Sequence, residues 1–396
     1  MTNREIFMKL LETDIAIVGG GIAGLWLFNR VKQQGFSAIL LESDALGSGQ
    51  TIKSQGIIHG GMKYALLGEM TESARALNNI PNIWRACLEG NGEIDLSSVS
   101  ILSSAQYLWT TSILSKFAGI FASKTLKSDT KKLEKHEYPE IFRSPLFKGE
   151  VYALDEMVLD AREIVQALAE PYREYIYKMD PLHDISLDEN DHIISLKTSD
   201  GITIKAQKYI FTAGSGNEQL LKKLKNSPLA MQKRPLHMVM VKHDIATPVY
   251  GHCLGLSALP RLTITTHRIS YDKYIWYIGG QIAEAGVKRD RVAQIDATKK
   301  ELQELFPWCD LSRAEYSSFF VDRAENKEPD GSRPAHCYFK DFGNIIVAWP
   351  TKLAFAPQLA AEILKQLNIT PADCHLDDNV LLPRPNIANL PWESMF

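Results

Sequence analysis

The sequence predicts an α/β protein whose parallel sheet begins close to its first residues. Three observations predict this class. An apolar run, Asp14–Val18, is typical of a buried strand, and it leads into a turn with four glycines between residues 19 and 24. The pattern that follows is helical and ends at Gly35. A second apolar run, Ser37–Leu41, then predicts another buried strand, which completes a βαβ unit.

The glycines of this unit stand where a dinucleotide-binding turn requires them. Gly19 allows the tight turn out of the strand, Gly21 lets the backbone approach a pyrophosphate, and Gly24 lets helix and sheet pack closely. Glu42 follows Gly24 by 18 residues, where a carboxylate can accept hydrogen bonds from ribose hydroxyls. The sequence therefore predicts a dinucleotide site, and the spacing alone leaves NAD and FAD open. Enzymes that combine NADPH with a flavin often carry a second such unit; this sequence has one, so we expect electrons to come from the substrate.

A segment rich in glycine and small polar residues follows, from Leu46 to Tyr64. Such a composition lets the backbone lie against a flat ligand and offers N–H groups to it. Its pattern Ser-x-Gly-x-Ile-His-x-Gly-x-x-Tyr, which starts at Ser54, resembles the D-amino-acid oxidase superfamily of FAD proteins. It looks most like the glycerol-3-phosphate dehydrogenase and L-2-hydroxyglutarate oxidase branches, with the glycine oxidase branch also similar. The resemblance implies FAD as the cofactor and places His59 beside its isoalloxazine ring.

Three later segments resemble the same superfamily in order. Asp155–Ala169 resembles the link into a helix of the FAD domain, and Lys208–Gly216 resembles the strand and turn that close against the dinucleotide. Asn344–Pro357 resembles the final strand and the helix whose N-terminus faces the flavin. The resemblance thus covers residues 14–367. It departs from the family at Trp349–Lys352, where many relatives have glycines.

The fingerprint and the resemblance together imply a set of residues in contact with the cofactor. They are Gly19, Gly21, Ile22, Ala23, Gly24, Glu42, Ser43, Gln50, Thr51, Ser54, Gln55, Gly56, Ile58, Ala213, Gly214, Thr351, Lys352 and Leu353. Lys352 precedes a predicted helix, Leu353–Gln366, where its charge would favour the anionic reduced flavin. The alternative is that Lys352 points to solvent and that only Thr351 caps the helix.

The resemblance implies a Rossmann-like FAD-binding domain and a second, α+β substrate domain with a mainly antiparallel sheet. We expect residues 10–85, 150–220 and 335–370 to form the first domain, and residues 86–149 and 221–334 to form the second. Residues 371–396, which are rich in proline, are predicted to be an extended tail along the surface.

The second domain contains clear strand and helix patterns. Strands are predicted at Lys233–Lys242, Arg261–Thr266 and Tyr274–Gly280, and an amphipathic helix at Ala297–Phe306. Another stretch, Tyr107–Leu126, has apolar residues at helical spacing. We expect a substrate-domain helix there; the alternative is a partner-binding or membrane-surface face, which leaves a peripheral membrane contact open.

Histidines are the candidate bases. A flavin oxidises a C–H bond next to an O–H or N–H group and takes the hydride at N5, and for an alcohol a base must take the hydroxyl proton. Histidine suits this role because its unperturbed pKa is about 6.5. His59 is favoured by its place in the glycine-rich loop, with His237, His252 and His267 as further candidates. The alternative for His59 is a hydrogen bond to the cofactor only.

Arginines are the candidate substrate-binding residues. Substrates of this superfamily usually carry a carboxylate or phosphate, which arginine binds by a two-pronged hydrogen bond. Arg323 and Arg333 fall where the relatives have substrate-binding arginines, and Arg234 is a third candidate. The alternative for each is a surface ion pair, and Arg323 has Asp322 and Glu325 close by in the sequence.

These assignments predict an FAD-dependent oxidoreductase, either an oxidase or a dehydrogenase, that oxidises a CH–OH or CH–NH bond of a small anionic substrate. Hydroxy acids, polyol phosphates and amino acids all fit, and the His59 loop favours the hydroxy compounds. Oxygen and a quinone both stay open as the electron acceptor. The alternative class is an FAD-binding protein whose flavin is structural, or a subunit of a larger flavoprotein assembly.

The composition excludes other classes. The 396 residues carry 44 Lys and Arg against 47 Asp and Glu, a net charge of −3, which does not favour binding to a nucleic-acid backbone. The five cysteines lie far apart without metal-ligand spacing, so we expect a reduced, cytoplasmic protein with no metal site. We also expect no export signal in Met1–Glu12 and no membrane-spanning segment.

Overall fold

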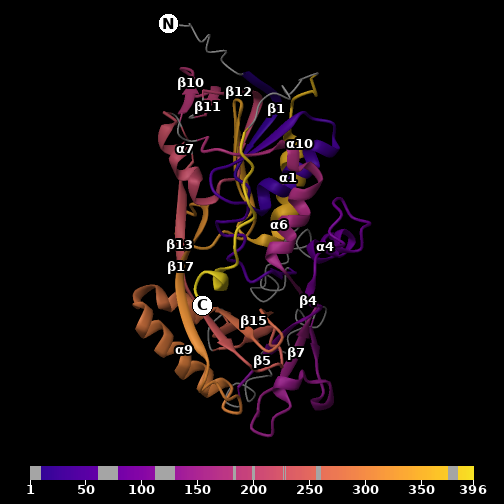
Figure 1. Cartoon of the computed structure of the whole chain (residues 1–396), viewed down its shortest axis with the longest axis vertical. Helices are drawn as coiled ribbons and strands as arrows, with labels where there is room; N and C mark the ends of the chain where they lie inside the picture. The colour runs from indigo at the N-terminus through magenta and orange to yellow at the C-terminus, as the bar shows by residue number, and fades with distance from the viewer. Residues whose placement is uncertain are drawn as a thin grey trace, which may run out of the picture.

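The computed structural model describes residues 10–60, 79–111, 130–181, 184–198, 201–225, 227, 229–255, 260–372 and 382–396. Figure 1 shows an elongated molecule with a sheet toward each end and a long two-stranded ribbon along one side. This arrangement confirms the predicted α/β class with a second, mainly antiparallel sheet.

The first sheet grows from the predicted βαβ unit. β1 (Leu10–Val18) pairs in parallel with β2 (Ala38–Glu42), and α1 (Ile22–Gln33) connects them. The other parallel strands are β9 (Ile176–Lys178), β12 (Thr203–Phe211) and β19 (Ile345–Trp349). Antiparallel strands extend the sheet: β10 (Asp184–Leu187), β11 (Ile193–Lys197) and β18 (Tyr338–Phe342). Because the five parallel strands run the same way, their carboxyl ends lie at one edge of the sheet.

Three helices pack together on this sheet. α1 contacts α6 (Ala161–Ala169) and α10 (Ala356–Gln366), and Figure 1 shows the three close together. α6 begins after Asp160, whose carboxylate accepts hydrogen bonds from two backbone N–H groups of the first turn. The buried faces of the helices and of β1 form one apolar core, in which Trp26 and Phe28 are fully buried.

The second sheet contains the three strands predicted between residues 233 and 280. They are β13 (Met231–His243), β15 (Leu262–Arg268) and β16 (Tyr274–Gly279). β13 pairs with β17 (Glu315–Asn326), and the two form the long ribbon of Figure 1. The sheet is completed by β14 (Gly251–Cys253), β5 (Gln106–Trp109), β7 (Val151–Leu154) and β6 (Thr130–Lys132). Of its strand pairs, the one between β14 and β5 is parallel and the others are antiparallel.

Two helix predictions in this part of the chain have different outcomes. The helix expected at Ala297–Phe306 is present as α9 (Arg291–Leu305), which begins earlier, at the capping residue Asp290. The helix expected at Tyr107–Leu126 is wrong at its start, because residues 107–109 belong to β5. Pairing with β14 on one side and β7 on the other overrides the helical spacing of the apolar residues. Residues 112–126 of that prediction lie outside the described residues.

A small third sheet is formed by three short strands that come from residues 57–159. It consists of β3 (Ile57–Ile58), β8 (Met157–Leu159) and β4 (Ile101–Ser103). Ile57 faces Val158 and Ile58 faces Met157 in the antiparallel pair of β3 and β8. This pairing brings residues 57–58 of the glycine-rich loop next to a segment about 100 residues further along the chain.

The predicted domain boundaries stay a prediction. Strands of the first sheet come from all three ranges expected in the FAD-binding domain, whereas β7, at the start of the range 150–220, pairs within the second sheet. No helix in the described ranges is long and apolar enough to span a membrane.

Residues 382–396 do not simply follow the surface, as the sequence predicts for the tail. Ile387 pairs with Leu46 in an isolated bridge, so the tail contacts the glycine-rich loop. Trp392 is 6% exposed and packs against the ring of His267, 4.5 Å away between centroids. Apolar burial therefore fixes the tail to the second sheet.

The buried His267 makes stability depend on pH. Burial lowers its pKa to about 3, whereas an imidazole in the unfolded chain titrates near 6.5. Below pH 6.5 the imidazole of residue 267 is therefore protonated in the unfolded chain and stays neutral in the folded chain. We expect the free energy of unfolding to fall by up to about 1.4 kcal/mol per pH unit from this group as pH drops below 6.5. His267→Gln should lose less stability between pH 7 and pH 5 than wild type, measured by urea unfolding.

The control for this prediction is His192→Asn, because His192 is exposed and hydrogen-bonded only locally, to Asp188. It should follow the wild-type pH dependence. A His267→Gln variant with the same pH dependence as wild type would contradict the assignment. Burial also lowers the pKa of His243, to about 4, so part of the acid sensitivity should persist in the variant.

Candidate active site

A cavity of about 750 Å³ lies at the carboxyl ends of β1, β2, β12 and β19. The turns that follow these strands line one part of it, and side chains of β13 and β17 line another. The loop of residues 48–59 also contributes to the lining. Ligands of α/β proteins bind at this edge of the sheet, so the position alone marks the cavity as the candidate site.

Two turns meet in the wall of the cavity. Gly19 has a φ of 107°, and a Cβ on it would lie 2.6 Å from Cα of Ala213. Thr212 secures this contact: its N–H donates to the carbonyl of Val18 (2.8 Å), and its hydroxyl donates to the carbonyl of Gly19 (3.0 Å). Glycine is therefore required at position 19 for two reasons: its positive φ, and the close approach of the turn that follows β12.

Glu42 and Thr51 hold the beginning of α1. Oε2 of Glu42 accepts a hydrogen bond from the N–H of Gly20 (2.7 Å), and Oγ1 of Thr51 accepts one from the N–H of Ile22 (2.9 Å). Among the described residues, the atom that a Cβ at Gly21 would meet within 4 Å is Oγ1 of Thr51, at 3.2 Å. Since Gly21 lines the cavity, a larger side chain there would extend into it.

The second sheet fixes the glycine-rich loop. Nε2 of Gln55 donates to the carbonyl of Tyr277 (2.9 Å), and the phenol of Tyr277 donates to the carbonyl of Lys53 (2.6 Å). Tyr277 is fully buried, and burial raises the pKa of its phenol, so the hydroxyl stays a hydrogen-bond donor at neutral pH. The loop that lines the cofactor side of the cavity is thus held by β16.

The last parallel strand ends in a turn with unusual backbone geometry. Thr351 has a φ of 59°, and its hydroxyl donates to the carbonyl of His336 (3.0 Å). The alternative in which Thr351 caps the helix is therefore wrong, because its side chain is engaged elsewhere. Lys352 lines the cavity, with Nζ 4.6 Å from the ring centroid of Phe355. The predicted helix follows as a 3₁₀ turn, η8 (Leu353–Phe355), and then α10.

The predicted cofactor contacts fall into two groups. Those that line the cavity are Gly19, Gly21, Ile22, Ala23, Glu42, Ser43, Gln50, Thr51, Ser54, Gln55, Ala213, Gly214, Thr351, Lys352 and Leu353. The lining does not include Gly24, Gly56 and Ile58. A Cβ at Gly24 would lie 2.0 Å from the carbonyl oxygen of Gly19, and one at Gly56 would lie 2.0 Å from that of Leu159. Ile58 is fully buried in the first core, so all three positions serve packing.

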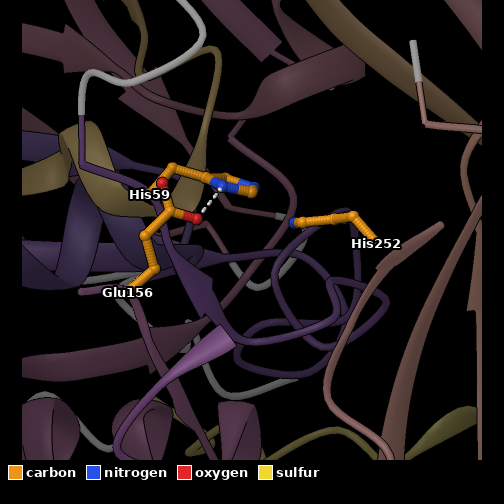
Figure 2. A group of neighbouring side chains, drawn as sticks. All are labelled: His59, Glu156 and His252. Carbon is orange, nitrogen blue, oxygen red and sulfur yellow. Dashed lines mark hydrogen bonds and ion pairs between the residues drawn. The ribbon is translucent and has the colours of Figure 1, made fainter. Parts of the chain in front are cut away.

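The favoured base, His59, lies beside a buried carboxylate. Nδ1 of His59 is 3.0 Å from Oε2 of Glu156, as Figure 2 shows, and the Glu156 side chain is 7% exposed. With this carboxylate as acceptor, the proton of the neutral imidazole sits on Nδ1 and leaves Nε2 as the basic nitrogen. His252 of β14 also lines the cavity; its ring centroid is 5.9 Å from that of His59.

The two other candidate histidines do not line the cavity. His237 is buried with its ring nitrogens 3.0 Å from the carbonyl oxygen of Gly286 and 3.0 Å from the hydroxyl of Ser318. His267 is buried against Trp392, as described above. Both hold elements of the second sheet together, and neither can reach a molecule in the cavity.

Two of the three candidate arginines line the cavity, Arg323 and Arg333. Nη1 of Arg323 donates to Oε1 of Glu284 (3.1 Å), and burial together with the nearby Arg234 lowers its pKa from the usual value. An arginine remains protonated at neutral pH all the same. Arg234 does not line the cavity, because its guanidinium is paired with the buried carboxylate of Glu325.

Comparison with known proteins identifies the family. The family model for the FAD dependent oxidoreductases known as DAO matches residues 14–348. The chain belongs to the DAO family. It is 43% identical over 396 residues to the FAD-dependent oxidoreductase PA4991 of Pseudomonas aeruginosa, covering 98% of this chain and 99% of that protein. The crystal structure of PA4991 aligns with a TM-score of 0.83 at 40% identity, over 97% of this chain and 98% of that one.

Two more distant structures share the fold. Glycine oxidase from Geobacillus kaustophilus aligns with a TM-score of 0.64 at 16% identity, over 91% of this chain and 97% of its own. The FAD-bound L-α-glycerophosphate oxidase from Mycoplasma pneumoniae aligns with a TM-score of 0.64 at 15% identity, over 96% and 99%. At 15–16% sequence identity, these two alignments show a shared fold only.

As a member of the DAO family the chain is an FAD-dependent oxidoreductase, and its residues fit the cofactor. The cavity next to Gly21 suits a pyrophosphate at the N-terminus of α1. Glu42 stands at the end of β2, where its carboxylate can accept hydrogen bonds from a ribose. The remainder of the lining includes His59 and Arg323, so the dinucleotide turns share one cavity with the candidate base and the candidate anion ligand.

The sequence does not point to two acidic residues of the site, Glu156 and Glu284. Glu156 comes opposite His59 because the register of β3 and β8 continues by one residue past Ile58 and Met157. The proximity of Glu156 to His59 can therefore be inferred only when the pairing of β3 with β8 is known. Glu284 lies in the short helix α8 (Gln281–Ala285), and no motif connects it to Arg323.

Substitution of two glycines should separate cofactor binding from packing. Gly21→Val should fold but purify without FAD, because its side chain enters the cavity. Gly24→Val should fail to fold, because a Cβ at this position lies 2.0 Å from the carbonyl oxygen of Gly19. The measurements are the ratio of flavin absorbance to protein absorbance and the circular dichroism spectrum. A yellow, stoichiometric Gly21→Val protein would contradict the cofactor site.

Proposed function

We propose that this DAO-family enzyme oxidises the CH–OH group of a small anionic substrate, a hydroxy acid or a polyol phosphate. FAD, when bound, would supply the hydride acceptor. The observation that carries the proposal is that His59, Arg323 and the dinucleotide turns line a single cavity. A base for the hydroxyl proton and a cation for the anionic group are what such a reaction requires of the protein.

His59 is the proposed base. Its Nε2 accepts the hydroxyl proton of the substrate, since Nδ1 is engaged with Glu156. The carboxylate of Glu156 keeps the ring in one orientation and stabilises the positive charge that the imidazole gains. This arrangement supports an alcohol substrate, in which loss of the hydroxyl proton must accompany hydride loss.

Arg323 and Arg333 are the proposed ligands of the substrate anion. Arg323 is held by two hydrogen bonds, from Nη1 to Glu284 and from Nε to the carbonyl of Arg234 (3.3 Å). A guanidinium fixed in this way loses little conformational entropy when it binds a carboxylate or phosphate. Glu284 balances part of its charge before the substrate arrives, which limits the cost of a buried cation.

Anaerobic reduction of the bound flavin tests this proposal. Hydroxy acids and glycerol 3-phosphate should bleach the flavin absorbance faster than amino acids of similar size. His59→Ala should retain FAD and slow this reduction by about 10²–10⁴-fold, the usual contribution of a general base. Arg323→Gln should mainly raise the substrate concentration needed for half-maximal reduction.

The outcomes of this experiment separate the candidate functions. Faster bleaching by amino acids would replace the alcohol with an amine as the substrate class. No bleaching by any member of the panel would favour a structural flavin. His59→Ala reduced at the wild-type rate would remove His59 from the mechanism, and His192→Ala serves as the control for an exposed histidine.

Lys352 is the proposed electrostatic partner of the reduced cofactor. A cation in the cavity wall stabilises the anionic reduced flavin, by about 0.3–2 kcal/mol for charges near a helix end. Because about 30 mV corresponds to 1.4 kcal/mol for a two-electron couple, Lys352→Met should lower the flavin midpoint potential by up to roughly tens of millivolts. The control is Lys365→Met, an exposed lysine in the last turn of α10. An unchanged or higher potential in Lys352→Met would contradict the proposal.

A further inference from the structure

Three side chains that can bind a metal ion meet in the wall of the cavity. One ligand atom each from His59, Glu156 and His252 lies within 4.8 Å of the other two. Figure 2 shows the three side chains gathered, with a ring nitrogen of His252 directed toward the other two. We propose that these residues form a binding site for one divalent transition-metal ion, with Zn²⁺ as the best match.

Strand pairing places the three donors. His59 directly follows β3 and Glu156 directly precedes β8, so the antiparallel pairing of these strands places the two donors side by side. His252 comes from β14 of the second sheet, where it pairs with Thr263 of β15. Donors in or directly next to paired strands have a fixed backbone position before an ion binds. Fewer conformations are then lost on binding, which reduces its conformational-entropy cost.

The histidine from the second sheet is oriented as in a typical metal site. Nδ1 of His252 lies 2.9 Å from Oγ1 of Thr263, which leaves Nε2 as the nitrogen for the ion. In metal sites the second ring nitrogen of a ligating histidine is usually engaged in this way, which fixes the ring. His252 is buried, so its orientation is also fixed by packing.

The charge of the cluster favours a cation. Glu156 is a carboxylate with 7% of its side chain exposed, and one of its oxygens lies within 4.8 Å of a nitrogen of each of two imidazoles. A buried carboxylate is costly unless a positive group compensates it, and a divalent ion would do so more fully than a neutral ring. The ion would bind Nδ1 of His59 in place of its proton, and the neutral imidazole would then carry its proton on Nε2.

The donor set selects the metal. Two imidazoles and one carboxylate suit Zn²⁺ and similar transition metals, whereas Mg²⁺ and Ca²⁺ prefer oxygen ligands. Zn–ligand bonds of about 2.0–2.2 Å place tetrahedral donors about 3.4 Å apart, so the widest spacing in the cluster must shorten by roughly 1.5 Å. His59 is the least buried of the three residues, with 26% of its side chain exposed, so we expect it to make this movement. A fourth position would remain open toward the cavity for water or a substrate oxygen.

Occupancy of the site has a consequence for catalysis, which rests on the proposed role of His59. An imidazole bound to Zn²⁺ is no longer available to take the hydroxyl proton, so zinc should inhibit flavin reduction. The binding itself does not depend on that role, because it follows from the donors alone. Zinc binding and zinc inhibition are therefore separate measurements.

Equilibrium dialysis of the tag-free holoenzyme against Zn²⁺, with elemental analysis, tests the site. Wild type should retain about one zinc ion per chain. Glu156→Gln keeps a hydrogen-bond partner for His59 but loses the anionic ligand, and His252→Asn loses a nitrogen ligand. Each should weaken zinc binding at least tenfold, since loss of an outer-sphere partner alone costs about 10–100-fold. The zinc X-ray absorption spectrum should show nitrogen and oxygen donors at about 2.0–2.1 Å with imidazole scattering, and no sulfur at 2.3 Å.

His192→Asn is the matched control. His192 forms an exposed pair with Asp188 at 3.2 Å, so it resembles half of the proposed site and should leave zinc binding unchanged. Flavin content and circular dichroism check that each variant is folded. Wild type that retains no zinc, or zinc binding that is the same in Glu156→Gln, His252→Asn and wild type, would overturn the proposal. Zinc that binds with these ligands and leaves flavin reduction unchanged would support the site and instead count against His59 as the base.

Discussion

The contact between the first glycine turn and the turn after β12 is the constraint on which the cavity depends. Gly19 can lie against Ala213 only because it has no side chain, and Thr212 secures both turns with hydrogen bonds. The ends of β1 and β12 are thereby held at a fixed separation. Since β2 and β19 pair with these two strands, the turns that carry Glu42 and Lys352 inherit the same spacing. The cofactor side of the cavity is therefore set by backbone contacts, which the side chains of Thr212, Glu42 and Thr51 reinforce with hydrogen bonds.

The reactive side of the cavity has a different origin. The glycine-rich loop leaves the first sheet, but its hydrogen bonds lead to β16 through Gln55 and Tyr277. His59 lies at the end of this loop, in contact with the third sheet through Glu156, while Arg323 belongs to β17 of the second. All three sheets thus contribute to one site. A small movement of one sheet relative to another would change the cofactor environment and the substrate contacts together.

Sequence reasoning succeeds here where the chemistry is local. The βαβ unit is recognisable because the glycines between residues 19 and 24 and Glu42 have fixed spacings, and the structure has the strands and the helix in the expected order. The long strands β13 and β16 are also evident from their composition. In such segments local preference and tertiary structure agree.

Prediction fails where the outcome depends on which distant segments pair. Tyr107–Trp109 begins a segment with apolar residues at helical spacing. These three residues lie between two strands, and pairing with those strands decides their conformation. Glu156 meets His59 only through the register of β3 and β8. Arg234 is a candidate anion ligand in the sequence, as Arg323 is, but in the structure its guanidinium forms an ion pair with the buried carboxylate of Glu325. None of these contacts leaves a pattern in the nearby residues, and the tail of residues 382–396 is a further example.

That tail also sets an order of events during synthesis. Backbone hydrogen bonds join Leu46 to residues 386 and 388, and Arg384 donates to the carbonyl of Ile176 (3.0 Å) at the edge of the first sheet. Trp392 fills a place in the core of the second sheet. These residues leave the ribosome after all the strands found in the described ranges, the last of which is β19. The contacts between the tail and the beginning of the glycine-rich loop can therefore form only after the strands have been synthesised, and the packing of Trp392 on the second sheet comes last.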